Sequence, residues 1–308
     1  MKLKRVIKIT GNILMAAALA FVVKKLFDMD ISFSDLKDDR VLISLMICFI
    51  FQTMIIIVSC YPWLMFIRSL SGRKVPYSAA MPVYTQSNLY KYLPGNVFQY
   101  VGRNKLAADM EISHVDVACA TVLDVFFCVF WTGVVSVMLL GGSIAELFDI
   151  YGRKLLIAGA AGILAAAAVT AVLSLKFRGR LREYLSRYSK AFEKSRRPQL
   201  LSGIFYYFLH NCVSAAMYFA CLSLIVPQAG AGALARLTGA FLFAWIIGFV
   251  TPGAPGGIGI REGVMLLVCG ERYMDRIVLF VLVMRVASVF ADVAAFILGR
   301  AYSRFRRS

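Results

Sequence analysis

The chain has 308 residues, of which 60% are hydrophobic and only 17% are charged, and its mean hydropathy is +0.74. A soluble domain carries about one charged residue in four, so this composition excludes an ordinary water-soluble protein and indicates a polytopic membrane protein. The net charge of +17 does not indicate nucleic-acid binding, because the basic residues cluster in short segments between apolar stretches, as the positive-inside rule expects.

The first predicted helix covers residues 9–23, an apolar stretch that follows the basic segment 1–8. A secretory signal peptide has the same pattern, and Ala18-Leu19-Ala20 resembles its cleavage site. We expect a retained helix instead, because the topology of the remaining chain requires a crossing at this position.

The second predicted span covers residues 41–67, which are apolar and long enough to cross a bilayer with some tilt. The preceding segment 24–40 is rich in aspartate and is expected to face outward. The basic residues that follow the span mark the cytoplasmic side: Arg68, Arg73 and Lys74.

Two short and moderately apolar stretches come next, residues 77–92 and 97–110, and Pro94-Gly95 separates them. Each is too short or too polar for a convincing crossing, and proline and glycine do not continue a helix. The pattern predicts a re-entrant hairpin that enters from the cytoplasm.

The third and fourth predicted spans cover residues 117–140 and 155–175. Segment 176–197 then contains nine Lys/Arg and two Glu, which places it in the cytoplasm. Its apolar residues recur at helical spacing, so we predict an amphipathic helix that lies on the inner leaflet. A solvated linker is the alternative.

The fifth predicted span, residues 200–226, leads to an external loop at residues 227–235. A half-length apolar piece follows at residues 237–250. It ends where prolines and glycines interrupt the sequence again.

This second interruption is the segment 251–262, Thr-Pro-Gly-Ala-Pro-Gly-Gly-Ile-Gly-Ile-Arg-Glu. Another half-length piece, residues 260–270, completes a second hairpin, which enters from the outside. The last span covers residues 277–298, and the arginines after it keep the end of the chain in the cytoplasm.

The predicted fold is an all-α polytopic membrane protein with about six full transmembrane helices and two re-entrant hairpins. The order is span, span, hairpin, span, and then the same four again with inverted topology. We predict a single membrane domain, 1–308, in the cytoplasmic (inner) membrane, with both termini in the cytoplasm and with inverted repeats at about 1–150 and 151–308.

The spacing within the two interruptions supports the repeat. Pro94 precedes Arg103 by nine positions and Pro252 precedes Arg261 by nine, and the two copies lie 158 residues apart. Broken backbone at membrane depth occurs only where protein or a watery cavity covers it, so both interruptions are candidate parts of a site.

On the first hairpin, the candidate residues for binding an anionic headgroup are Asn96, Gln99 or Tyr100, and Arg103, which share one helix face. A half-helix that begins inside the membrane presents unpaired N–H groups and a positive dipole end. A phosphate at this terminus would meet backbone donors, an amide and a guanidinium.

The second hairpin and the last span add further candidates. Gly256 and Gly257 begin the second half-helix, where Arg261 would bind the anion and Glu262 would bind an amine or balance charge. In the last span, Arg285, Ser288 and Asp292 lie on one face. Asp124 and Asp292 are candidate sites for proton coupling.

A purely structural role is the alternative for these charges. Arg103 and Arg261 would then snorkel towards an interface or pair with Asp124, Asp292 or Glu262 to stabilise the bundle. His210-Asn211 is expected to be a hydrogen-bonded pair in the core.

No catalytic constellation is present, since the sequence contains no GxSxG, HExxH or P-loop pattern. The seven cysteines lie in apolar spans without a CxxC, and there are only two histidines. We therefore expect no enzyme activity, no cofactor and no metal.

These residues resemble one known family. Leu93-Pro94-Gly95 with Gly102-Arg103, the segment 251–262, and Arg285 are similar to the membrane domain of the lysylphosphatidylglycerol synthase/flippase family. The similarity covers nearly the whole chain. The family tends to have a Glu-Arg pair before the aspartate at position 124, and this chain has Thr121-Val122 there.

The resemblance implies a lipid-handling membrane domain that moves an aminoacylated phospholipid between leaflets. The sequence ends at Ser308, directly after the last predicted helix, so we expect no synthase domain and no lysyl transfer.

The main hypothesis from the sequence is translocation of an anionic phospholipid or glycolipid, with membrane lipids as partners and no nucleic acid. The alternative is a non-transporting membrane subunit that recruits an envelope-biosynthesis enzyme, with segment 176–197 as the contact surface. An integral-membrane transferase is a third possibility.

Overall fold

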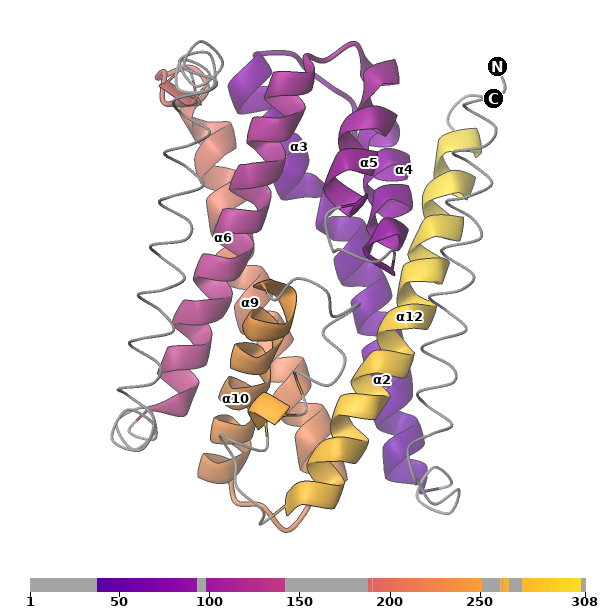
Figure 1. The fold of residues 1–308 in the computed structure, drawn as a ribbon, viewed down its shortest axis with the longest axis vertical. Coiled ribbons are helices and arrows are strands. Elements are labelled where there is room, and N and C mark those ends of the chain that lie inside the picture. Colours follow the sequence, from indigo (N-terminus) through magenta and orange to yellow (C-terminus); the bar gives the residue numbers. More distant parts are fainter. Residues whose placement is uncertain are drawn as a thin grey trace.

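The computed structural model describes residues 38–92, 98–141, 188–189, 191–250, 261, 263–265 and 273–305. All regular elements in these ranges are helices (Figure 1), as predicted for an all-α protein. Five of the described helices are long and apolar enough to cross a membrane, which agrees with a multi-pass membrane protein: Asp39–Ser71, His114–Leu140, Arg197–Ile225, Ala231–Phe249 and Asp275–Phe305. The predicted spans 9–23 and 155–175 and most of segment 176–197 lie outside the described residues.

The second predicted span is present, but it is longer than expected and consists of two helices. The first, α2, covers Asp39–Val58 and begins where the Asp38 side chain accepts a hydrogen bond from Arg40 N. The second, α3, covers Cys60–Ser71. The helix is interrupted at Ser59 because Pro62, in the first turn of α3, has no N–H to donate back to residue 58.

The first predicted hairpin corresponds to two short helical arms, and its re-entrant insertion into the membrane stays a prediction. The descending arm is α4 (Tyr77–Asn88) with the 3₁₀ turn η2 (Leu89–Tyr92), and the ascending arm is α5 (Phe98–Leu106) with η3 (Ala107–Met110). Both arms lie in the upper half of Figure 1, at the end of the molecule where α12 terminates. The tip that joins them, residues 93–97, lies outside the described residues.

Three further predicted spans are confirmed with extended bounds. They are α6 (His114–Leu140), α9 (Arg197–Ile225) and α12 (Met274–Phe305). The side chain of Ser113 caps α6 by accepting a hydrogen bond from Val115 N at 3.2 Å, so the helix begins three residues before the apolar run.

The prediction of a half-length piece at 237–250 after a loop at 227–235 is wrong. Helix α10 begins at Ala231 and runs to Val250, a total of 20 residues. Residues 231–235 are Ala-Gly-Ala-Leu-Ala, and the high helix propensity of alanine and leucine extends the helix into the expected loop. By length α10 is therefore a candidate span, so the predicted count of six spans plus two hairpins is not confirmed.

The interior contains two large apolar cores rather than one. One core joins α2, α9, α10 and α12 around Phe241 and Phe280. The other joins α3, α4, α6 and α9 around Trp63 and Phe66. Polar side chains of the same helices gather between the cores, and this boundary contains the candidate site.

Each half of the chain packs its shorter helices against the last helix of the other half. Helix α4 contacts α12, and α10 contacts α6, while α2 lies along α12 and α9 packs between α2, α3 and α6. Figure 1 shows α4 and α5 at one end of the molecule and α10 at the other.

Candidate functional site

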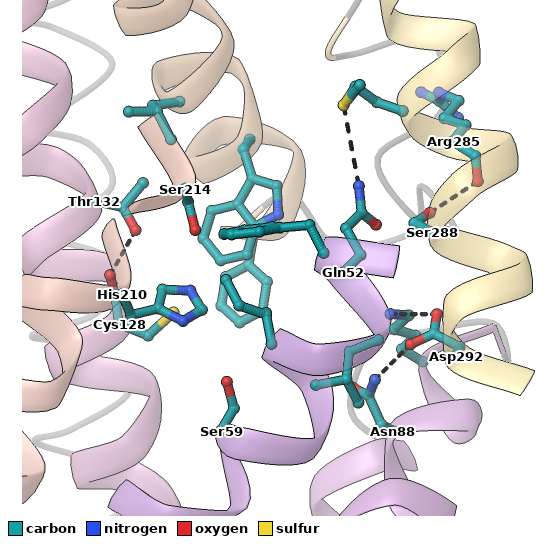
Figure 2. Close-up of a pocket in the computed structure, with 18 of the residues that line it drawn as sticks. Gln52, Ser59, Asn88, Cys128, Thr132, His210, Ser214, Arg285, Ser288 and Asp292 are labelled. Atoms are coloured by element: carbon teal, nitrogen blue, oxygen red, sulfur yellow. Dashed lines mark hydrogen bonds and ion pairs between the residues drawn. The ribbon is translucent and has the colours of Figure 1, made fainter. Parts of the chain in front are cut away.

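A cavity of about 290 Å³ lies at the boundary between the two cores, and side chains from α2, α4, η2, α5, α6, α9, α10 and α12 line it. Figure 2 shows its two opposite walls, with Thr132 and His210 on one side and α12 on the other. The polar residues that line it come from elements throughout the described chain: Gln52, Ser59, Tyr84, Asn88, Lys91, Tyr92, Gln99, Thr132, His210, Asn211, Ser214, Arg261, Arg285, Ser288 and Asp292.

Among the described residues that line the cavity, cations outnumber carboxylates. Lys91, Arg261 and Arg285 are its cationic lining residues, and Asp292 is the carboxylate among the described residues that line it. Three cations against one carboxylate leave an excess of two positive charges in the described lining. Because the surroundings are apolar and screen charge weakly, such a lining favours an anionic ligand.

The carboxylate of Asp292 holds the end of the first arm of the hairpin, α4 with η2, on α12. Asn88 Nδ2 donates to Oδ1 at 2.6 Å, and Tyr92 OH donates to Oδ2 at 2.5 Å. The ammonium of Lys91 lies 2.6 Å from Oδ2. Asp292 itself is 1% exposed, and two hydrogen bonds and an ion pair offset the cost of burying its charge.

The predicted face of the last span is present in the structure. Arg285, Ser288 and Asp292 all line the cavity from α12, as Figure 2 shows. The hydroxyl of Ser288 donates to the carbonyl of Arg285 at 2.9 Å, so its donor is used within the helix. Spacings of three and four residues put all three side chains on one side of the helix.

The opposite wall only partly matches the expected core pair His210-Asn211. Asn211 is hydrogen-bonded as expected, because its Oδ1 accepts from Thr132 Oγ1 at 2.7 Å and its Nδ2 donates to Tyr207 O at 2.8 Å. The prediction is wrong for His210, whose buried Nδ1 has no hydrogen-bond partner among the described residues. The imidazole lines the cavity instead and packs beside the rings of Tyr206 and Tyr207.

Arg103 is paired inside the protein. Its Nη1 lies 2.8 Å from Asp124 Oδ2, its Nε donates to Ser87 Oγ at 3.1 Å, and its guanidinium lies 4.1 Å from the ring centre of Tyr84. The side chain is 3% exposed. This arrangement is the one that the structural alternative expected for Arg103 and Asp124.

Asp124 has a further partner on α9, since Tyr207 OH donates to its Oδ1 at 2.5 Å. The cluster of Arg103, Asp124, Ser87 and Tyr207 therefore links α4, α5, α6 and α9 beside the cavity. A role of Asp124 or Asp292 in proton coupling stays a prediction.

The remaining candidates fall into three groups. Gln99 faces the cavity from α5, whereas Tyr100 faces a groove on the other side of that helix. Arg261 also lines the cavity. The other predicted site residues lie outside the described residues: Asn96, Gly256, Gly257 and Glu262.

Several cavity residues were not predicted from the sequence. Lys91 and Asn88 belong to the first hairpin, Gln52 lies in the second predicted span, and Ser214 lies in the fifth. Their common signal is a polar side chain within or next to an apolar stretch, which is costly in a bilayer unless it faces a partner or a cavity.

Among the described residues, no group of three or more His, Cys, Asp or Glu side chains is placed to hold a metal ion. Comparisons of the chain with known protein families, with curated proteins and with solved structures found no match.

Proposed function

We propose that the chain binds the anionic headgroup of a membrane lipid in the central cavity and carries it between the two leaflets. The observation that carries this proposal is the charge of the cavity lining, where Lys91, Arg261 and Arg285 outnumber Asp292 at the boundary between two apolar cores. Cations at membrane depth are costly unless they face a partner or a polar cavity, and all three of these side chains line the cavity.

The chemistry of the lining favours phosphate. A guanidinium forms two parallel hydrogen bonds to a phosphate or carboxylate, and Arg261 and Arg285 each bring one to the cavity. The unpartnered Nδ1 of His210 and the amide of Gln99 offer additional hydrogen-bonding positions.

The size of the cavity favours a headgroup over a whole lipid. Its volume of about 290 Å³ is at the lower end of the range for small-molecule sites. Each acyl chain of a phospholipid extends over about half of a 30 Å hydrocarbon core, so the chains remain in the bilayer while the headgroup occupies the cavity.

The finer topology is part of the same proposal. Two inverted repeats would place the site at their interface, where alternate exposure to the two sides moves the headgroup across. The contacts of α4 with α12 and of α10 with α6 support it, because each links a helix that precedes a Pro/Gly interruption in one predicted repeat to the last described helix of the other. Membership of the lysylphosphatidylglycerol synthase/flippase family is proposed on the same residues as above.

A liposome assay tests the proposal. Purified protein is reconstituted with a fluorescent phosphatidylglycerol, and movement of the label between leaflets is followed by quenching from outside. Arg261→Gln and Arg285→Gln remove one cation each and are expected to slow transport at least about tenfold, the effect of losing about 1.4 kcal/mol of binding to the headgroup.

Arg300→Gln is the matched control, because Arg300 is an exposed arginine on the same helix as Arg285, outside the cavity. We expect its transport rate to equal that of the unsubstituted chain. Equal rates in all three variants would overturn the assignment of the cavity, and so would transport that does not distinguish phosphatidylglycerol from phosphatidylcholine.

A further inference from the structure

A second depression of about 1000 Å³ runs between α5 and α6, on the side of these helices away from the central cavity. Its wall is almost entirely apolar, and α6 supplies most of it: Ala118, Thr121, Val122, Val125, Phe126, Val129 and Phe130. Several of these side chains are strongly exposed, including Val122 at 59% and Phe126 at 56%. We call this depression the α5–α6 groove.

The length of the groove matches one leaflet of a bilayer. From His114 at one end to Phe130 at the other, α6 rises about 1.5 Å per residue, or about 24 Å over the 16 steps. One leaflet with its headgroups is about 20–22 Å thick. A lipid aligned with the groove would therefore have its headgroup at the His114 end and the end of its chain beside Phe130.

The cationic residue of the groove, Lys105, lies at the His114 end. Lys105 and Asn104 of α5 line it there, and Lys105 is exposed. Asn104 Nδ2 donates to His114 O at 2.9 Å, and its Oδ1 lies 2.5 Å from His114 Nδ1, so this pair joins α5 to α6. The ammonium of Lys105 then provides the charge that complements a lipid phosphate.

The groove and the central cavity share one side chain. Phe249, near the end of α10, lines both of them, and its ring stacks on Trp245 with centroids 5.0 Å apart. Trp245 lines the cavity only. Among the described residues, Phe249 is therefore the side chain that borders both the apolar groove and the cationic cavity.

We propose that the α5–α6 groove holds one acyl chain of an anionic phospholipid, with its phosphate at Lys105, and that Phe249 is the gate through which the headgroup reaches the central cavity. The occupant is a lipid because the groove combines an apolar wall of leaflet length with a cation at one end. This inference rests on the proposed function, since it supplies the route by which that substrate arrives.

Photolabelling tests the docking site without requiring transport. Phosphatidylglycerol with a diazirine near the end of one chain is mixed into phosphatidylcholine vesicles that contain the protein, and labelled residues are mapped by mass spectrometry. We expect labels on Val129, Phe130 and Phe249. Val125→Trp fills the groove and is expected to reduce this labelling about tenfold, the loss expected when roughly two methylene groups lose their contacts.

Met138→Trp is the matched control, because Met138 is exposed on the same helix but outside the groove. Lys105→Gln is expected to reduce labelling by phosphatidylglycerol more than labelling by the corresponding phosphatidylcholine probe, because the choline cation of phosphatidylcholine balances the charge of its phosphate. Labels spread evenly over α6, or a groove label that survives Val125→Trp, would overturn the docking site.

The gate has its own readout. Phe249→Ala is expected to speed transport several-fold while groove labelling stays constant, and an unchanged or slower rate would overturn the gate. The two proposals fail separately. Groove labelling with transport unaffected by Arg261→Gln and Arg285→Gln would refute the cavity assignment alone, and transport that depends on these arginines without groove labelling would refute the groove alone.

Discussion

Arg103 of α5 and Asp124 of α6 form an ion pair of 2.8 Å inside the helix bundle, with side chains that are only 3% and 6% exposed. Two buried charges that satisfy each other cost little as a pair, but either one alone is strongly unfavourable. The pair thus fixes the first hairpin against α6 and keeps both charges out of the lipid.

We expect Arg103→Gln to lower the free energy of unfolding by about 3–5 kcal/mol, because Asp124 is left buried without its partner. Lys105→Gln, an exposed change two residues further along α5, should alter it by less than about 0.5 kcal/mol. Unfolding by SDS in mixed micelles measures both. The double variant Arg103→Met/Asp124→Leu should lose less free energy of unfolding than the sum of the losses in Arg103→Met and in Asp124→Leu. Losses that add in full would contradict the pairing.

The 3₁₀ turn η2 offers an isosteric comparison. Tyr92→Phe removes a hydroxyl that donates to the buried Asp292 carboxylate, and a hydrogen bond to a charged group is worth about 1.5–3 kcal/mol. Tyr90→Phe removes a hydroxyl that, among the described residues, accepts a hydrogen bond from the neutral amide of Gln86 at 3.3 Å. The same unfolding assay should show the larger loss for Tyr92→Phe, and equal losses would contradict the role of Asp292 as the anchor of the hairpin.

Close packing of α4 on α12 depends on Gly299. A Cβ at this position would overlap Thr85 Oγ1, and that hydroxyl is held by its hydrogen bond to Met81 O at 2.9 Å. We expect Gly299→Ala to destabilise the protein by about 1–3 kcal/mol, as overpacking does elsewhere.

Gly133→Ala is the control for this change. Its new Cβ would meet only Ile246 Cδ1, at an ordinary 3.8 Å, in the interior of α6. Alanine has the higher helix propensity, so stability should stay equal or rise by up to about 1 kcal/mol. Thermal unfolding in detergent ranks the two variants, and a stable Gly299→Ala would show that α4 and α12 lie further apart.

The contact between α2 and α9 is accessible to cross-linking. Cys48 Sγ and Cys221 Sγ lie 3.2 Å apart in the buried core, with the sulfur of Met217 3.5 Å from Cys48. A membrane-permeant oxidant is therefore expected to join the two cysteines, and peptide mapping should recover the linked pair. Cys48→Ser should abolish this product, and a cross-link of Cys48 to Cys60 instead would contradict the packing of these helices.

Much of the fold follows from hydrophobic runs and from helix breakers. The apolar stretches 117–140, 200–226 and 277–298 correspond to α6, α9 and α12, because a long apolar run has few stable alternatives to a helix. The predicted ends of these helices were less accurate, since capping residues such as Ser113 extend a helix beyond its apolar run. The length of α10 was underestimated for a related reason, because the helix propensity of the residues in its first turn, and not their hydrophobicity, extends the helix there.

The partners of the charged residues were harder to predict. The sequence placed Arg285, Ser288 and Asp292 on one face, because that requires only the geometry of one helix. It left open whether Arg103 pairs with an acid or binds a ligand, since that depends on which helices meet in space. Lys91 was missed for the same reason, because its ion pair with Asp292 joins residues 201 positions apart in the sequence.

Three side chains from one end of α4 and η2 bind the same carboxylate, and this limits how α12 can move. Asn88, Lys91 and Tyr92 all hold Asp292, so a displacement of α12 away from the first hairpin must release them together. A helix restrained in this way moves between two discrete positions and not through a continuum, since a partly released carboxylate is buried without enough partners. The three contacts to Asp292 would therefore break and form together each time α12 moves away from the first hairpin and returns.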